Sequence, residues 1–326
     1  MSKIALTGLS HMGSLLSPSG MKSKLAILIY HRVFHSPDPL SPGEPTASRF
    51  DWQMAVLRRY FTPLALSEAA ARLENGTLPE RAVSVTFDDG YADNFNVALP
   101  ILRKWEIPAT FFIATGFLDG GRMWNDTVIE AVRAAKGEPL DLGELGMEMH
   151  AISTDNGRRS TLHALLSRLK YLPPGERQEK VLSLAKVVGE ALPDDLMMTS
   201  SQVRLMHLAG MEIGAHTVNH PILTRLSPQE VEKEILQSRV RLEDMLGKKV
   251  TSFAYPNGRP GVDYDRTHVE AVRKAGFEVS VSTSWGCAHR NDDLLQLPRI
   301  ATWDQTPVMF SARIIKSYIR RTAVFA

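Results

Sequence analysis

The stretch Val83-Ser84-Val85-Thr86-Phe87-Asp88-Asp89-Gly90-Tyr91 joins a Val-rich apolar run to two adjacent carboxylates and a glycine. The apolar run predicts a buried strand over 83–87, which places both carboxylates at its C-terminal end. In parallel α/β sheets and barrels, that end of the strands carries the active site. One carboxylate there can bind a cation, while the other stays ionised beside that charge and can take a proton from water. The alternative is a plain Asp-Asp-Gly turn that caps the next helix.

Similar apolar runs recur along the chain and alternate with helical patterns, which favours parallel strands joined by helices. Six or seven such units fit a closed or nearly closed barrel better than an open sheet, which stays the alternative. We therefore predict an α/β fold, a distorted (β/α)7-type barrel with a helical insertion. The predicted strands are Leu25–Tyr30, Val83–Phe87, Ala109–Ala114, Met211–Ala215, Val250–Tyr255, Phe277–Val281 and, with a weaker pattern, Leu297–Thr302.

Helix start signals stand between these runs. A capping box of Ser227 and Glu230, with a proline at the first helical position, predicts a helix toward Leu246. Three further caps are predicted: Ser48 for a helix through Tyr60, Ser67 for Glu68–Glu74, and Asp265 for a helix that ends at Gly276.

The repeat of strands and helices is interrupted between Phe117 and Ser200, where helical patterns such as Leu162–Leu172 and Gln178–Leu192 follow one another. We predict a helical insertion over about 118–200 within a single domain that spans 21–326. Residues 1–20 are rich in Gly and Ser, and we predict that they are poorly ordered.

Composition limits the classes of function. The formal net charge of +2 gives no reason to expect nucleic acid or an anionic membrane surface as the main partner. A single cysteine excludes an intrachain disulfide. No apolar run reaches the roughly 18 residues that span a bilayer, and the N-terminus lacks a secretory signal pattern. The expected compartment is the cytoplasm, with peripheral association with the cell envelope left open.

A second motif, His216-Thr217-Val218-Asn219-His220, follows the predicted strand Met211–Ala215 and belongs on the same barrel face as the carboxylates. Two histidines four residues apart come together if the segment turns helically. Two imidazoles and one carboxylate are a common ligand set for a catalytic metal with open positions. The alternative is a pair of surface histidines. Pro221 disfavours a long helix here and favours a shaped loop.

Two more polar groups leave predicted strands. His31 ends the first strand and, from the far side of a bound metal, could protonate a leaving amine. The turn Pro256-Asn257-Gly258 could point backbone N–H groups at an oxyanion. Each has an ordinary alternative, a rim histidine with a satisfied hydrogen bond and a Pro/Gly-rich loop. Four polar clusters that each follow a strand are less readily accidental than any one of them.

With these motifs the sequence resembles the polysaccharide deacetylases, also called carbohydrate esterase family four or the NodB-homology domain. Thr86–Gly90 matches the first family motif, and His216–His220 matches the second, which opens with His-Ser/Thr and ends in His. Pro256–Gly258 looks like the third motif. The resemblance covers roughly residues 25–300.

The resemblance implies roles for these residues. Asp88 would be the general base, and the metal ligands would be Asp89, His216 and His220. The backbone N–H of Asn257 would serve the oxyanion hole.

The late family motifs differ in this sequence. No Leu-x-His motif follows residue 258, and Tyr30-His31 looks like that motif moved to the N-terminus, an order similar to the poly-N-acetylglucosamine deacetylases. His31 is therefore the candidate general acid. The usual arginine before the third motif is missing, and Arg259 and Arg299 are alternative replacements. Trp303-Asp304 is only a weak echo of the Asp-x-x-Asp-Trp motif.

The implied activity is metal-dependent hydrolysis of N-acetyl groups on an N-acetylated sugar or polysaccharide, with Zn²⁺ as the expected metal. The expected substrate contacts are Tyr91, Trp124, Tyr255 and Arg259, with a packing role as the alternative for Trp124. Two other functions stay open. One is a deacetylase or amidase of a small or lipid-linked intracellular substrate, and the other is a catalytically inactive sugar-binding barrel. The sequence gives no oligomeric state.

Overall fold

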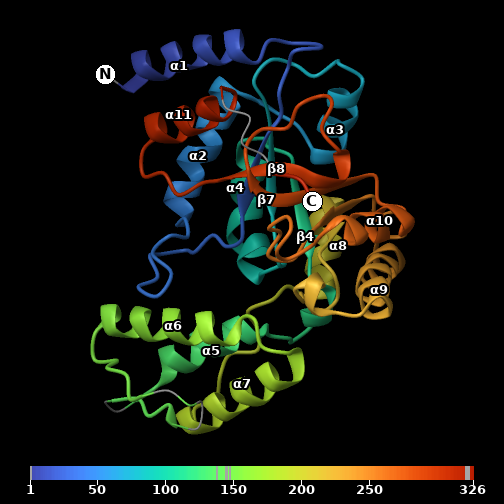
Figure 1. Cartoon of the computed structure of the whole chain (residues 1–326). Helices are drawn as coiled ribbons and strands as arrows, with labels where there is room; N and C mark the ends of the chain where they lie inside the picture. Colours follow the sequence, from blue (N-terminus) through green and yellow to red (C-terminus); the bar gives the residue numbers. More distant parts are fainter. Residues whose placement is uncertain (1, 137–138, 144–145, 147, 320–323) are drawn as a thin grey trace.

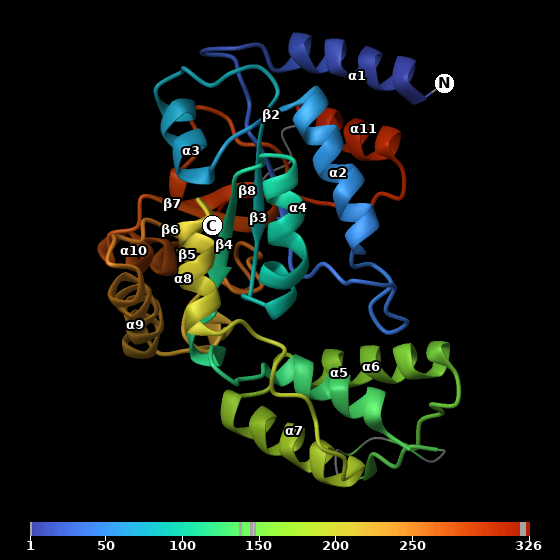
Figure 2. The same ribbon diagram turned by 180° about the vertical axis from the view of Figure 1, so that it is seen from behind.

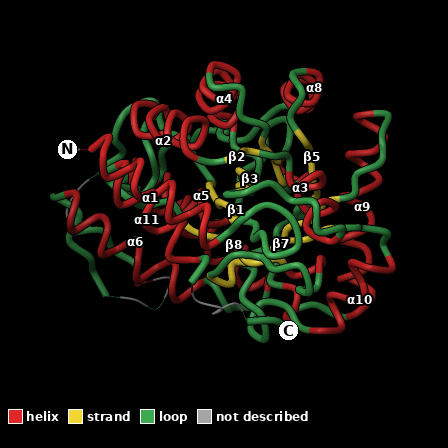
Figure 3. The backbone as a smooth tube through the Cα atoms, turned by 90° about the horizontal axis from the view of Figure 1, so that it is seen from above, coloured by secondary structure: helices red, strands yellow, loops and turns green. Residues whose placement is uncertain are grey.

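The computed structural model describes residues 2–136, 139–143, 146, 148–319 and 324–326. Its centre is a sheet in the order β1-β8-β7-β6-β5-β4-β3-β2. Because β1 also pairs with β3, the strands close into a barrel, and β2 stays outside the ring beside β3. Figure 3 looks onto this ring of strands with helices around it. The closed parallel barrel confirms the predicted fold class.

The strand bounds agree closely with the predicted runs, although β2, which is two residues long, was not predicted. The strands are β1 (Ala26–Tyr30), β2 (Thr62–Pro63), β3 (Ala82–Phe87), β4 (Ala109–Ile113), β5 (Glu212–Ala215), β6 (Ser252–Ala254), β7 (Val279–Trp285) and β8 (Leu297–Ala301).

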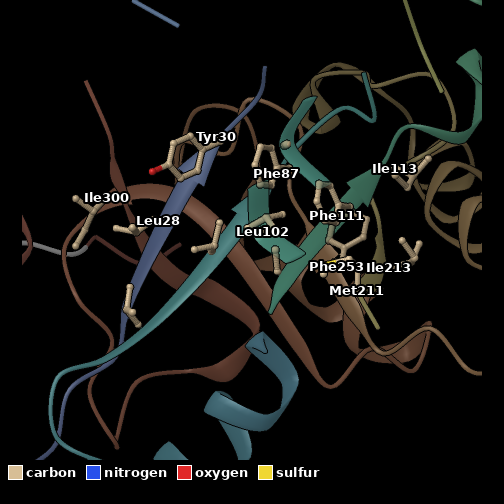
Figure 4. Close-up of a cluster of buried hydrophobic side chains, with 14 of the residues drawn as sticks. Leu28, Tyr30, Phe87, Leu102, Phe111, Ile113, Met211, Ile213, Phe253 and Ile300 are labelled. Carbon is tan, nitrogen blue, oxygen red and sulfur yellow. The ribbon is translucent and has the colours of Figure 1, made fainter. Parts of the chain in front are cut away.

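Alternation along the strands divides the core into two clusters. Tyr30, Phe87 and Phe111 lie on one face, with ring centroids 5.3 Å and 4.7 Å apart, and pack against the surrounding helices (Figure 4). Side chains of opposite parity, such as Ile27 and Phe112, form the second cluster with the inner face of the helix that follows β2. Since successive side chains of a strand point to opposite faces, one barrel wall serves both clusters.

Gly214 shows how closely the strands approach inside the barrel. A Cβ at this position would lie 2.5 Å from the Phe112 ring and 2.7 Å from the Ser252 hydroxyl. No real side chain fits there, so the glycine lets β5 approach its neighbours immediately before His216.

Helices cover the outside of the barrel. Those of the barrel layer are α2 (Ala47–Tyr60), α3 (Leu66–Glu74), α4 (Leu99–Lys104), α8 (Ser200–Leu208), α9 (Pro228–Leu246), α10 (Arg266–Lys274) and α11 (Pro307–Ser317). Short helical turns are η1 (Asn94–Ala98), η2 (Thr115–Phe117), η4 (Leu223–Arg225) and η5 (Leu294–Gln296).

Two of the predicted helix caps are correct and two are wrong. The Ser227–Glu230 capping box opens α9, and Asp265 caps α10. In contrast, α2 is capped by Thr46, whose side chain accepts from the Arg49 N–H, and α3 begins after Ala65. Ser67 is used elsewhere, because its N–H and hydroxyl both donate to Glu212 on β5.

Three helices between β4 and α8 form a separate layer beside the C-terminal ends of the strands (Figures 1 and 2). They are α5 (Trp124–Ala134), α6 (Asp155–Leu169) and α7 (Pro174–Val188), and they share a hydrophobic cluster that is distinct from the barrel clusters. They occupy the stretch for which the sequence predicts a helical insertion.

The prediction of a poorly ordered segment over 1–20 is wrong for most of its length. Ser2–Leu16 forms α1, which packs against α11 (Figure 1). Leu6, Leu9 and Leu16 recur at helical spacing, and Leu6 is buried. The Gly and Ser residues concealed this apolar stripe. Within the described ranges, no helix has both the length and the apolarity needed to cross a membrane.

Candidate active site

The Asp88-Asp89 turn continues β3 at the barrel rim. The Asp88 N–H donates to the carbonyl of Tyr30 at 3.0 Å, and both aspartates are buried. Thr86 and Asp88 lie on one face of the strand, since both side chains bind the same arginine. Asp89 has a φ of 77°, which turns its carboxylate away from that of Asp88. Left-handed backbone is uncommon outside glycine and often marks a functional site.

Arg299 on β8 is the partner of Asp88. Its two terminal nitrogens donate to the two carboxylate oxygens, each at 2.7 Å, and its Nε donates to the carbonyl of Ser282. Both side chains are almost completely buried. Burial alone would raise the pKa of Asp88, but the guanidinium outweighs it and holds that pKa below its ordinary value. Of the two candidate replacement arginines, the structure therefore selects Arg299.

Asp89, His216 and His220 meet, although more than a hundred residues separate the first from the other two. The Oδ1 atom of Asp89 lies 3.4 Å from Nε2 of His216 and 3.4 Å from Nε2 of His220. Ligand atoms of the three residues lie within 4.8 Å of one another. This Oδ1 atom is buried and, among the described residues, has no hydrogen-bond partner. A buried oxygen that faces two imidazole nitrogens without bonding either one fits a bound cation.

The histidines are prepared for metal binding. Nδ1 of His216 lies 2.7 Å from the carbonyl of Ala254 on β6, so Nδ1 carries the proton and Nε2 presents its lone pair toward Asp89. Burial lowers the pKa of His220 to about 4, which keeps this imidazole neutral at neutral pH. Burial would also lower the pKa of His216, but the two aspartates outweigh it and raise that pKa. A cation would take the place of that proton.

Glu234 on α9 fixes the loop that carries the two histidines. Its carboxylate accepts from the N–H of Val218 at 2.9 Å and from the N–H and side-chain amide of Asn219 at 2.8 and 2.7 Å. These bonds hold a loop in which Thr217 and His220 have φ values of 62° and 51°. Nothing in the local sequence pattern identified this glutamate, because it lies in an ordinary polar position of an amphipathic helix.

His31 lies on the same rim, as predicted. It lines a cavity of about 230 Å³ together with Asp89 and Tyr91 from the barrel and Asp126 from α5. A metal at Asp89 and a protonated imidazole at His31 would therefore face one shared space. Glu44 also lines this cavity, and burial raises its pKa while His31 opposes the increase.

Asn257 has a φ of 59° in the turn after β6. Its carbonyl accepts from the Thr283 hydroxyl at 2.8 Å, which fixes the peptide. In the part of the chain that the structure describes, its N–H makes no hydrogen bond. A fixed N–H without a partner is the arrangement that an oxyanion donor requires.

Two of the expected substrate contacts lie at the cavities around the insertion. Tyr91 is buried, and its hydroxyl donates to Asp126 at 2.9 Å while Arg32 covers its ring at 4.5 Å. Tyr91 thus ties the insertion to the metal-bearing turn, and burial raises the pKa of Asp126 to about 7. Trp124 lines a different cleft, between α7 and α9, and the Arg177 guanidinium lies 5.0 Å from the centre of its ring.

The other two expected contacts are wrong. Tyr255 is fully buried, stacks on Tyr264 with centroids 3.9 Å apart, and donates its hydroxyl to the carbonyl of Leu295. Arg259 binds Asp263 and the Tyr171 hydroxyl and does not line the cavities that contain His31. Both residues follow β6 closely in sequence, but proximity along the chain does not fix the direction of a side chain.

Comparison with known proteins gives one family. The family model for polysaccharide deacetylase matches residues 75–280. The Bacillus subtilis protein YxkH, whose name assigns it to the polysaccharide deacetylases, is 23% identical over 279 residues, which cover 85% of this chain and 71% of YxkH. A poly-β-1,6-N-acetyl-D-glucosamine N-deacetylase of Staphylococcus aureus is 29% identical over 40% of this chain and half of its own length.

Two solved structures share the fold. The Streptococcus pyogenes deacetylase PplD, solved in complex with acetate, has a TM-score of 0.59 at 24% identity, with 90% of this chain and 98% of that chain covered. IcaB from Ammonifex degensii has a TM-score of 0.58 at 21% identity, with 92% and 98% covered.

Proposed function

The chain belongs to the polysaccharide deacetylase family, and from that premise we propose that it is a metal-dependent hydrolase that removes N-acetyl groups from an N-acetylated sugar or polysaccharide. The observation that carries the proposal is the buried cluster of Asp89, His216 and His220 beside the Arg299-paired Asp88. A barrel that had lost catalysis would have no need to keep a charged base buried next to an intact ligand set.

The donor set fits a divalent metal. Two neutral imidazole nitrogens and one carboxylate oxygen suit Zn²⁺, which we propose as the metal. When bound, such an ion would polarise the acetyl carbonyl and lower the pKa of water.

The residues around the cluster supply the remaining chemistry. Asp88 is ionised, because Arg299 holds its pKa low, and accepts a proton as water attacks the acetyl carbon. The Asn257 N–H donates to the oxyanion that forms. His31, as imidazolium, then donates a proton to the nitrogen as the C–N bond breaks. Acetate and a free amine leave, and the proton taken up by Asp88 balances the one given by His31.

The test is release of acetate by the metal-replete protein. The panel contains β-1,6- and β-1,4-linked N-acetylglucosamine oligomers, the monosaccharide and a lipid-linked N-acetyl sugar. We expect acetate from at least one sugar class, which also separates the polymer from the lipid-linked alternative. Stoichiometric metal with no acetate from any acetylated sugar would refute the proposal. The cytoplasmic compartment expected from the sequence stays a prediction, which cell fractionation would test.

Replacing His31 with Ala should slow acetamide hydrolysis about 10²-fold or more, in line with the usual contribution of a positioned general acid. An aryl acetate should be affected far less, because a phenolate leaves without a proton whereas an amine does not. The measurement is kcat/KM for both substrates with the wild type and the variant. Equal losses on the two substrates would show that His31 does not act as the acid.

Replacing Arg299 with Gln should shift the acid limb of the kcat/KM–pH profile to higher pH. The guanidinium lowers the pKa of Asp88, so its removal raises that pKa, and the base becomes protonated over a range in which it is ionised in the wild type. Activity at neutral pH should fall accordingly. Arg259→Gln is the matched control, since that arginine is half exposed and paired elsewhere, and its profile should stay unchanged.

A further inference from the structure

A second cavity opens beside the metal cluster, between the ends of β1, β7 and β8. It has a volume of about 310 Å³, larger than the 230 Å³ cavity that Asp89 lines. We call it the tryptophan cavity, and its lining includes His31, Glu44, Thr283, Trp285, Arg299 and Trp303. His31 and Glu44 line both cavities, so the two spaces adjoin at the proposed general acid.

The two tryptophans come from strands that end at the barrel rim. Trp285 is the last residue of β7 and is half-buried, and Trp303 follows β8 by two residues. Trp303 is 65% exposed, which is unusual for so large an apolar side chain. It is nevertheless held in place, because Arg313 lies 6.0 Å from the centre of its ring and is itself fixed by two bonds to the buried Asp304.

The proposed reaction decides which side of His31 the sugar occupies. The acetyl carbonyl must lie toward the cluster of Asp89, His216 and His220, where the oxyanion forms. The nitrogen that His31 protonates is attached to the sugar. The sugar ring must therefore extend from the His31 side and away from Asp89, and the space on that side is the tryptophan cavity.

We propose that the tryptophan cavity is a saccharide subsite, and that the substrate is a chain of N-acetylated hexosamine units in which the sugar next to the reacting one packs on Trp303 and Trp285. This inference rests on the proposed deacetylase function. The apolar C–H face of a pyranose suits an indole face, while Glu44 and Arg299 offer polar groups at the edge of the same cavity. A monosaccharide would leave this aromatic surface uncovered.

Binding is measured without turnover, in the zinc-loaded Asp88→Asn protein. Calorimetric titration with N-acetylglucosamine hexamers, β-1,6- or β-1,4-linked, gives Kd for this parent and for parents that also carry Trp303→Ala, Trp303→Phe or Trp285→Ala. We expect Trp303→Ala to raise Kd about tenfold, the scale of one aromatic contact, and Trp303→Phe to raise it less. Met309→Ala is the matched control, since that side chain is exposed on α11 and is not among the lining residues.

The outcomes separate the subsite from the proposed function. A parent that binds neither hexamer, or Kd values within twofold of the parent for both alanine variants, would overturn the subsite. Acetate release by the wild type is measured in parallel and tests the deacetylase function by itself. In the otherwise wild-type enzyme, Trp303→Ala should raise KM for the hexamer and leave kcat nearly unchanged, a separation that a general loss of folding would not produce.

Discussion

Replacing Asp89 with alanine is expected to abolish stoichiometric divalent-metal binding and, with it, deacetylation. The Oδ1 atom of this residue lies 3.4 Å from both imidazole Nε2 atoms, so the substitution leaves two ligands in place of three. Stabilisation of developing charge by a bound metal is worth several kcal/mol, and each 1.36 kcal/mol is a factor of ten in rate. We therefore expect kcat/KM to fall by about 10³-fold or more.

The measurement for Asp89→Ala is metal content after dialysis against trace zinc, together with acetate release. Asp244→Ala provides the control, because that carboxylate is exposed on α9 and far along the chain from the cluster. It should keep both the metal and the activity. Wild-type metal content in Asp89→Ala would show that the cluster is not the metal site, whatever happens to the activity.

Replacing Asp88 with asparagine should remove activity while the metal stays bound. General-base catalysis typically contributes 10²–10⁴-fold, and we expect a loss of kcat near the upper end, about 10⁴-fold, because the base acts directly on the attacking water. The amide cannot accept the paired charge of Arg299, which is fully buried. Leaving that guanidinium unpaired should also reduce the free energy of unfolding by about 3 kcal/mol.

The double variant Asp88→Asn/Arg299→Gln separates these two effects. It removes the unpaired charge, so thermal stability should recover relative to Asp88→Asn alone, whereas activity should not. Differential scanning calorimetry and acetate release on the two variants make the comparison. Activity that returned along with stability would mean that Asp88 supports the fold and is not the base.

Much of the barrel could be predicted because its strands are continuous apolar runs followed by polar motifs. That pattern was enough to place Asp88, Asp89, His216 and His220 on one rim, and the structure brings them together. The two-residue β2 has no such run, since it depends on pairing with β3. Caps at Ser48 and Ser67 were plausible locally, but Ser67 is engaged by Glu212, a residue 145 positions away.

The rest of the site depended on distant pairings that no local pattern contains. Arg299 reaches Asp88 only because β8 closes the ring beside β1, and Glu234 reaches the histidine loop only because α9 packs on β5. Tyr255 was misplaced for a related reason. The residue after a short strand can point into the core or toward the rim, and packing against Tyr264 decides between them.

The closure of the ring by β8 has a consequence for how the protein becomes active during synthesis. His31 leaves the ribosome early, but the guanidinium that keeps the base ionised arrives only with residue 299, and β1 has an open edge until β8 docks against it. A chain that stops short of β8 would already contain the whole metal cluster. It would nevertheless have a buried, unneutralised aspartate beside that cluster, so competence arises at the end of translation and is not accumulated along the way.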